Sequence, residues 1–203
     1  MVVGEAVGAD QPLTVRGQDH PWVSRGGLKL VAGLDGFGLT VAGRVALDVG
    51  ASTGGFTDVL LSRGAARVYA VDVGHGQMRL RDPRLTVIEG LNARDLEASH
   101  LAHRVDLIVC DVSFISLRLA LPRALALALP GAHLVALIKP QFEVGPEAVG
   151  KGGIVRDATA QDGAVRDVAR FLAESGWTVL GTIASPIAGG DGNREFLIAA
   201  RKR

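Results

Sequence analysis

The sequence contains few of the residues on which disulfide-rich and metal-cluster proteins depend. Among its 203 residues there is one cysteine, Cys110, so no disulfide can form within the chain and a cysteine-based metal cluster is excluded. A single cysteine is typical of the reducing cytoplasm, where we expect the chain to act. The first residues, MVVGEAVGADQPL, include acids and lack the basic segment and apolar core of a secretory signal peptide.

Uninterrupted apolar segments and an excess of one charge are also missing. Residues 119–138 are long enough to span a membrane, but Pro122, Arg123, Pro130 and Gly131 interrupt them. We therefore expect a buried helix, a turn and a strand in this segment. The formal net charge is +1, so nucleic-acid binding would require a local basic patch. The histidines are scattered, and we expect no metal site.

The residues that are abundant indicate a globular α/β domain. Hydrophobic residues make up 48% of the chain, and short apolar runs alternate with amphipathic segments, which is typical of strands that alternate with helices. Continuous apolar strands between helices indicate a mostly parallel sheet with helices on both faces. We predict strands at residues 45–48, 67–72, 85–89, 105–111, 133–139, 177–182 and 195–200, and helices at residues 24–38, 55–63, 94–101, 116–129 and 161–175.

The two ends of the chain differ from this regular pattern. The last two predicted strands are joined by ASPIAGGDGN, which is too rich in Gly and Pro for a long helix. This link favours a hairpin, with an antiparallel strand at one edge of the sheet. Residues 1–22 contain frequent Gly, Pro and Asp and no long helical pattern, so we predict a small β-rich piece or a flexible arm there.

The stretch LDVGASTGGFTDVL, residues 47–60, predicts a strand, a turn of small residues and a helix. Such a turn lets the backbone approach a ligand closely. A dinucleotide would require G-x-G-x-x-G, and Ser52 stands where the second glycine belongs, which argues against that ligand. The spacing of Asp48, Gly50 and Gly54 instead matches the D-x-G-x-x-x-G pattern of S-adenosylmethionine sites. A tight packing turn without a ligand is the remaining alternative.

Residues that follow the next two strands extend this candidate site. Asp72 ends the second predicted strand, 22 residues after Gly50, which is the usual place for an acceptor of ribose hydroxyls. Asn92 and Ala93 follow the third predicted strand, where the adenine of such ligands often lies. Asn92 is alternatively a helix N-cap.

Four ionisable residues occupy places where a sheet protein rarely carries charge. Asp111 and Lys139 end two very apolar strands, Lys29 lies in the first helix, and Glu195 begins the last strand. The carboxyl ends of neighbouring parallel strands meet at one edge, so we expect Asp111 and Lys139 to converge beside the ligand. A lysine near carboxylates can take a proton from a hydroxyl. The alternative is that each charge marks the solvated end of its strand.

The ordered motifs identify a family. The strings VSRGGLKL, LDVGASTGGFTD, VDVGHGQ, CDVSFISL, IKPQFEVG, KGGIVRD and SPIAGGDGNREFL closely resemble the TlyA-like ribosomal RNA methyltransferases, some of which carry the name haemolysin. Their catalytic domain is similar to that of FtsJ-type RNA ribose methyltransferases. The resemblance covers residues 23 to about 200.

This resemblance implies a seven-stranded, Rossmann-like class I methyltransferase fold with S-adenosylmethionine as methyl donor. It implies 2′-O-methylation of ribose in ribosomal RNA, typically at cytidine of 16S or 23S RNA, with ribosomal subunits as partners. It also implies a catalytic Lys-Asp-Lys-Glu tetrad at Lys29, Asp111, Lys139 and Glu195, in which Lys139 acts on the 2′-hydroxyl. The implied cofactor residues are Asp48, Gly50, Ser52, Gly54, Gly55, Phe56, Asp72, Asn92, Ala93 and Asp111.

The chain departs from the family pattern at its start, which leaves other functions open. Members usually begin with an S4-type RNA-binding domain, of which residues 1–22 resemble only a remnant, before the methyltransferase domain at residues 23–203. RNA or DNA base N-methylation is one alternative, although DVSF lacks both prolines of the signature used there. A non-catalytic RNA-binding or haemolytic protein is the other. Phe114 and Phe142, beside the proposed catalytic residues, are candidates for stacking on a base or for core packing.

Overall fold

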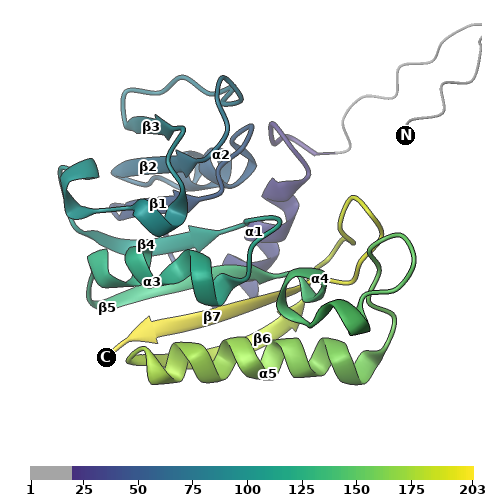
Figure 1. Cartoon of the computed structure of the whole chain (residues 1–203). Coiled ribbons are helices and arrows are strands. Elements are labelled where there is room, and N and C mark those ends of the chain that lie inside the picture. The colour runs from purple at the N-terminus through teal and green to yellow at the C-terminus, as the bar shows by residue number, and fades with distance from the viewer. Residues whose placement is uncertain (1–19) are drawn as a thin grey trace, which may run out of the picture.

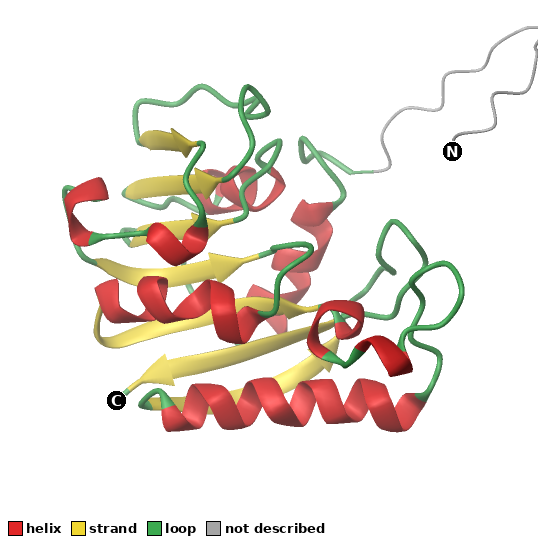
Figure 2. Ribbon diagram, viewed as in Figure 1, coloured by secondary structure: helices red, strands yellow, loops and turns green. Residues whose placement is uncertain are grey.

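A computed structural model describes residues 20–203, which form one sheet with helices on both faces (Figures 1 and 2). Most of the segment predicted as an RNA-binding remnant or arm lies outside the described residues. The strands are β1 (Val45–Val49), β2 (Arg67–Asp72), β3 (Leu85–Glu89), β4 (Val105–Cys110), β5 (Ala128–Ile138), β6 (Trp177–Ala184) and β7 (Phe196–Lys202). The α-helices are α1 (Gly26–Gly36), α2 (Gly55–Ser62), α3 (Leu117–Leu127), α4 (Pro140–Glu143) and α5 (Ala158–Glu174).

The strand order is β3-β2-β1-β4-β5-β7-β6. Strands β1 to β5 pair in parallel, whereas β7 runs antiparallel to both β5 and β6. The predicted seven-stranded, mostly parallel sheet and its C-terminal hairpin are therefore confirmed. The antiparallel strand lies one position in from the edge, because β7 inserts between β5 and β6.

The alternating directions of side chains along the strands divide the core into two layers. Leu107 and Val109 of β4 pack with α1 and α2 on one face, whereas Ile108 of the same strand packs with α3 and α5 on the other. Successive residues of a strand point to opposite faces, and both faces are covered here. This explains why the strands have continuous apolar sequences.

One predicted helix is wrong. Residues 94–101 form two short 3-10 turns, at Ala93–Asp95 and Ala98–His100. Between them Leu96 has extended backbone angles and a buried side chain, so burial of this leucine interrupts the helical path. A helix of this length is marginal in water, because too few hydrogen bonds offset the cost of nucleation.

The boundary between α3 and β5 lies earlier than predicted. The helix ends at Leu127 and the strand begins at Ala128, five residues before the predicted start at residue 133. Leu129 precedes Pro130, and a residue in that position is disfavoured in helical conformation. The apolar segment 119–138 thus forms a helix that leads directly into a strand. No helix in residues 20–203 has the length and apolar character needed to cross a bilayer.

We predict that Leu134→Ala lowers the free energy of unfolding by about 2–5 kcal/mol, because it leaves a cavity in the middle of the sheet. Leu134 is fully buried on β5 and pairs with Ile108 of β4 and Ala200 of β7. Urea denaturation measures the change. The matched control is Leu180→Ala, since Leu180 is 46% exposed, and this variant should stay within about 0.5 kcal/mol of the parent protein. Equal effects of the two substitutions would contradict this description of the core.

Candidate active site

The turn between β1 and α2 lies against the end of β4. Gly50 has φ +83, and a Cβ atom at this position would lie 2.4 Å from the backbone oxygen of Asp111. Only glycine fits there without moving the neighbouring strand. Ser52 has φ 47, also in the left-handed region. The turn therefore has an unusual backbone that keeps the ends of β1 and β4 in contact.

Asp72 at the end of β2 fixes the same turn from the other side. One carboxylate oxygen accepts a hydrogen bond from the Ser52 backbone N–H at 2.8 Å, and the other accepts one from Gly74 at 2.7 Å. Each carboxylate oxygen has two lone pairs, so both can still accept a hydrogen bond from a ligand hydroxyl. Asp72 thus combines a structural role with free acceptor capacity, and contact with a ribose stays a prediction.

Asp48 lies beneath the turn and not in a cleft. Its side chain is fully buried; one oxygen accepts a hydrogen bond from the Thr57 hydroxyl at 2.6 Å. The other oxygen has no partner within the described part of the chain. Burial raises the pKa of Asp48 to about 7, although the Thr57 hydrogen bond opposes the rise. The structure shows Asp48 supporting the start of α2, and contact with a cofactor ammonium stays a prediction.

Two clefts open at the carboxyl ends of the parallel strands, with volumes of about 840 and 790 Å³. Both are lined by Gly50, Ser52, Asp111 and Ser113, so they are continuous around the glycine turn. Of the residues predicted to bind the cofactor, Gly55 and Phe56 line the first cleft, whereas Asp72, Asn92 and Ala93 line the second. Gly54 lines neither, and a Cβ there would lie 2.8 Å from the sulfur of Met78.

Asn92 also has the alternative role that the sequence predicts. Its side-chain oxygen accepts a hydrogen bond from the Arg94 backbone N–H and caps the first 3-10 turn. The cap holds the backbone of this turn along the wall of the second cleft, so capping and ligand contact are compatible at this position.

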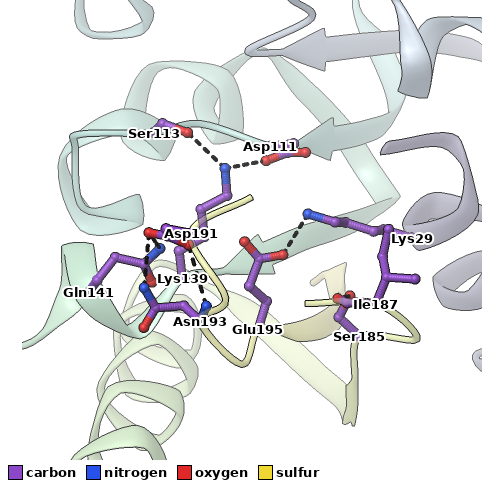
Figure 3. Close-up of polar contacts among 10 residues, drawn as sticks. All are labelled: Lys29, Asp111, Ser113, Lys139, Gln141, Ser185, Ile187, Asp191, Asn193 and Glu195. Carbon is purple, nitrogen blue, oxygen red and sulfur yellow. Dashed lines mark hydrogen bonds and ion pairs between the residues drawn. The ribbon is translucent and has the colours of Figure 1, made fainter. Parts of the chain in front are cut away.

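The four predicted catalytic residues form two ion pairs in one region (Figure 3). The Nζ atom of Lys139 lies 2.7 Å from the Asp111 carboxylate, and that of Lys29 lies 2.6 Å from the Glu195 carboxylate. The predicted convergence of Asp111 and Lys139 is therefore observed. The Lys29–Glu195 pair is nearly inaccessible to solvent, with side-chain exposures of 10% and 2%. Solvated strand ends do not explain this arrangement, because buried charge is costly unless it is paired.

The two pairs influence each other electrostatically. Burial raises the pKa of Glu195, and the ion pair with Lys29 opposes that rise, with a further contribution from the charge of Lys139. The site therefore contains two lysines and two carboxylates that share one weakly solvated environment. Such an arrangement is suited to hold and transfer a proton.

A third cleft of about 450 Å³ opens beside Lys139 and Glu195. Its walls include Phe114, which is 90% exposed and has φ 64, and Phe142, whose ring lies 5.2 Å from that of Phe114. A large, exposed aromatic residue with a left-handed backbone conformation is unfavourable for the free energy of folding, so folding alone does not explain its presence. This aromatic pair is a suitable surface for stacking a nucleotide base.

Two polar residues of the site are not predicted from the sequence. Ser113 accepts a hydrogen bond from Lys139 Nζ at 2.8 Å. Asn193, which is 1% exposed, accepts a hydrogen bond from the Val155 N–H at 3.0 Å and donates one to the Gly153 carbonyl at 2.8 Å. It thereby ties the glycine-rich segment that lines the third cleft to the strand that begins after Glu195. The only signal for either residue is its position two residues from a predicted catalytic group.

The family model for FtsJ-like methyltransferases matches residues 22–202. The chain belongs to this family. The resemblance inferred from the motifs is thus confirmed, and the clefts and the two ion pairs lie within the matched FtsJ-like methyltransferase domain.

Individual relatives agree with this membership. The 16S/23S rRNA (cytidine-2′-O)-methyltransferase TlyA of Mycobacterium tuberculosis (strain ATCC 25618 / H37Rv) is 50% identical over 190 residues, which cover 92% of this chain and 71% of the relative. A solved structure from Streptococcus thermophilus that carries a hemolysin name is 43% identical, with a TM-score of 0.88, and the match covers 92% of this chain and 69% of that one.

A more distant solved structure shares the fold. This structure is that of magnesium protoporphyrin IX methyltransferase ChlM from Synechocystis PCC 6803, with bound S-adenosylhomocysteine. It has a TM-score of 0.61 at 15% sequence identity, and the match covers 88% of this chain and 82% of the ChlM chain. This likeness confirms the Rossmann-like methyltransferase fold of the FtsJ-like domain.

We predict that Asp48→Asn removes a pH dependence of stability from this FtsJ-like methyltransferase. The pKa of Asp48 rises from 3.8 to about 7 on folding, so the unfolded chain releases this proton more readily. The parent protein should therefore lose stability as the pH rises from 4 to 7, by an amount on the order of 4 kcal/mol. The stability of Asp48→Asn relative to the parent protein should rise over this range and level off above pH 7.

Thermal unfolding at several pH values, without cofactor, measures this effect. Asp162→Asn is the control, because Asp162 is exposed on α5 and its loss should leave the pH dependence unchanged. A constant difference in Tm between Asp48→Asn and the parent protein from pH 5 to pH 8 would show that Asp48 is not the responsible group.

Proposed function

We propose that this chain transfers the methyl group of S-adenosylmethionine to the 2′-hydroxyl of a ribose in ribosomal RNA, at cytidine. The observation that supports this function most directly is the Lys139–Asp111 pair at the meeting point of the clefts, with the Lys29–Glu195 pair beside it. An alcohol is a weak nucleophile, and a positioned lysine with a carboxylate can orient it and accept its proton.

The two continuous clefts fit S-adenosylmethionine. Asp72 offers acceptor oxygens for the ribose hydroxyls, and the Gly50 turn permits close approach of the amino-acid portion. Asn92 and Ala93 would contact the adenine, whereas Gly55 and Phe56 would contact the other end of the ligand. When bound, the cofactor supplies an electrophilic methyl group on a positively charged sulfur.

The residues of the tetrad have separable tasks in this proposal. Lys139 Nζ holds the 2′-oxygen, and the proton released as the O–CH₃ bond forms passes to the Asp111 carboxylate, because the Lys139 ammonium has no lone pair to accept it. The Lys29–Glu195 pair fixes the neighbouring wall and the local charge. Because the reaction needs a nearly linear approach of oxygen to carbon, alignment by these side chains should supply much of the rate enhancement.

The proposed substrate follows from both the cleft and the relatives. The third cleft places Phe114 and Phe142 beside Lys139, where a base could stack while its ribose faces the lysine. The relative that is 50% identical is named for cytidine-2′-O-methylation of 16S and 23S rRNA. A base N-methyltransferase would not need this tetrad, so methylation of a base nitrogen is the alternative that the product analysis must exclude.

We predict that Lys139→Ala lowers the rate of methyl transfer by roughly 100-fold or more, because the hydroxyl loses the group that orients it beside the proton acceptor Asp111. Binding of S-adenosylmethionine should remain, since Lys139 is not among the residues proposed to hold it. Radiolabelled methyl transfer to ribosomal subunits and to naked rRNA, followed by mass spectrometry of nucleosides, measures rate and product. Arg166→Ala, on the exposed surface of α5, is the control.

A 2′-O-methylcytidine product that disappears with Lys139→Ala supports the proposal. Full activity of this variant would overturn the assigned mechanism, and a methyl group on a base nitrogen would overturn the assigned reaction.

We predict that Asp72→Asn weakens S-adenosylmethionine binding by roughly 10- to 100-fold, because hydrogen bonds from hydroxyls to a charged carboxylate are stronger than those to an amide. Isothermal titration calorimetry measures the affinity. Glu174→Gln, an exposed carboxyl near the end of α5, should bind as the parent protein does. If the parent protein itself binds no S-adenosylmethionine, a non-catalytic role consistent with the hemolysin name becomes the better hypothesis.

A further inference from the structure

Ser113 occupies the point where the substrate-side and cofactor-side clefts meet. Among the described residues it alone lines all three clefts, whereas Asp111 and Lys139 each line two. Its hydroxyl accepts a hydrogen bond from Lys139 Nζ at 2.8 Å. The residue is therefore next to the group that the proposed reaction uses and is also open to a bound substrate.

Lys139 is held by one hydrogen bond and one ion pair. Its Nζ atom lies 2.7 Å from Asp111 Oδ1 and 2.8 Å from Ser113 Oγ, as Figure 3 shows. Its side chain is 12% exposed, so it has little freedom to form other contacts. A lysine ammonium has three N–H groups at tetrahedral angles. Ser113 accepts one of them in a hydrogen bond, whereas Asp111 Oδ1 lies at ion-pair distance without the geometry of a hydrogen bond, so Ser113 gives the ammonium its orientation.

The backbone around Ser113 is itself fixed. On one side the Asp111 N–H donates to the Val49 carbonyl at 3.0 Å. On the other, Ser116 Oγ donates to Glu143 at 2.7 Å, and the Leu117 N–H donates to the same carboxylate at 2.7 Å. Phe114, in its left-handed conformation, turns the chain between these anchors. Ser113 is thus presented to Lys139 by a rigid turn and not by a free loop.

We infer that Ser113 is a positioning residue, which acts through Lys139 and, with Asp111 as the charge partner, aims a free N–H of that lysine at the reacting 2′-oxygen. This inference rests on the proposed function. With Asp111 alone, the lysine would retain its charge partner but could rotate about the remaining contact. The two contacts differ in kind: Asp111 supplies a charge, whereas Ser113 supplies only a direction.

The test compares Ser113→Ala and Ser113→Thr with the parent protein in steady-state methyl transfer to ribosomal subunits. Ser113→Ala should lower kcat by roughly 10- to 100-fold, the range expected for loss of a hydrogen bond to a charged group. The KM for RNA, the Kd for S-adenosylmethionine and the Tm should stay unchanged. Ser113→Thr restores the hydroxyl and should recover most of kcat. Ser62→Ala, an exposed serine at the end of α2, is the matched control.

The inference is overturned by an unchanged kcat in Ser113→Ala. It is equally overturned if the activity is lost through KM, Kd or Tm, or if Ser113→Thr is as impaired as Ser113→Ala. A failure of the proposed function has a different result: the parent protein itself would then place no methyl group on a ribose. An active parent with an active Ser113→Ala variant removes only the role of Ser113.

Discussion

The contact between the ends of β1 and β4 is the constraint on which the site depends. Gly50 lies so close to the backbone of Asp111 that a side chain on it would displace the neighbouring strand. The same approach brings the turn that is suited to a cofactor next to the carboxylate that holds Lys139. Parallel pairing of β1, β4 and β5 places all three strand ends at one edge. The proposed cofactor and nucleophile sites are therefore neighbours because of backbone packing.

Buried charge is organised by pairing at this edge, with one exception. Each lysine of the tetrad has a carboxylate within ion-pair distance, which offsets the cost of removing it from water. Asp48 has only a hydroxyl as partner. Burial raises the pKa of Asp48 to about 7, and below that pH a protonated Asp48 joins β1 to α2 without an additional cation.

Much of the fold and most of the candidate site were predictable from the sequence. Apolar periodicity identifies each strand to within five residues. A charge after a very apolar run is rare, which singles out Asp111 and Lys139, whereas the grouping of all four residues as a tetrad rests on the family resemblance. Periodicity fails at residues 94–101, where the burial of Leu96 outweighs helical spacing. Ser113 could not be singled out, since a serine after a strand has many ordinary uses. Only the geometry shows that it contacts Lys139.

The reversed direction of β7 has a consequence for the composition of the site. Phe196, the first residue of β7, pairs with Ile138, the last residue of β5, so Glu195 and Lys139 are the next residues beyond the same rung. In a parallel arrangement the start of this strand would lie at the opposite edge, roughly 20 Å away for a strand of this length. In an all-parallel sheet the strands would thus contribute to this edge only residues that follow them. Because β7 is reversed, Glu195, which precedes this strand, lies beside residues that follow strands. The last segment of the chain thereby contributes the fourth member of the tetrad.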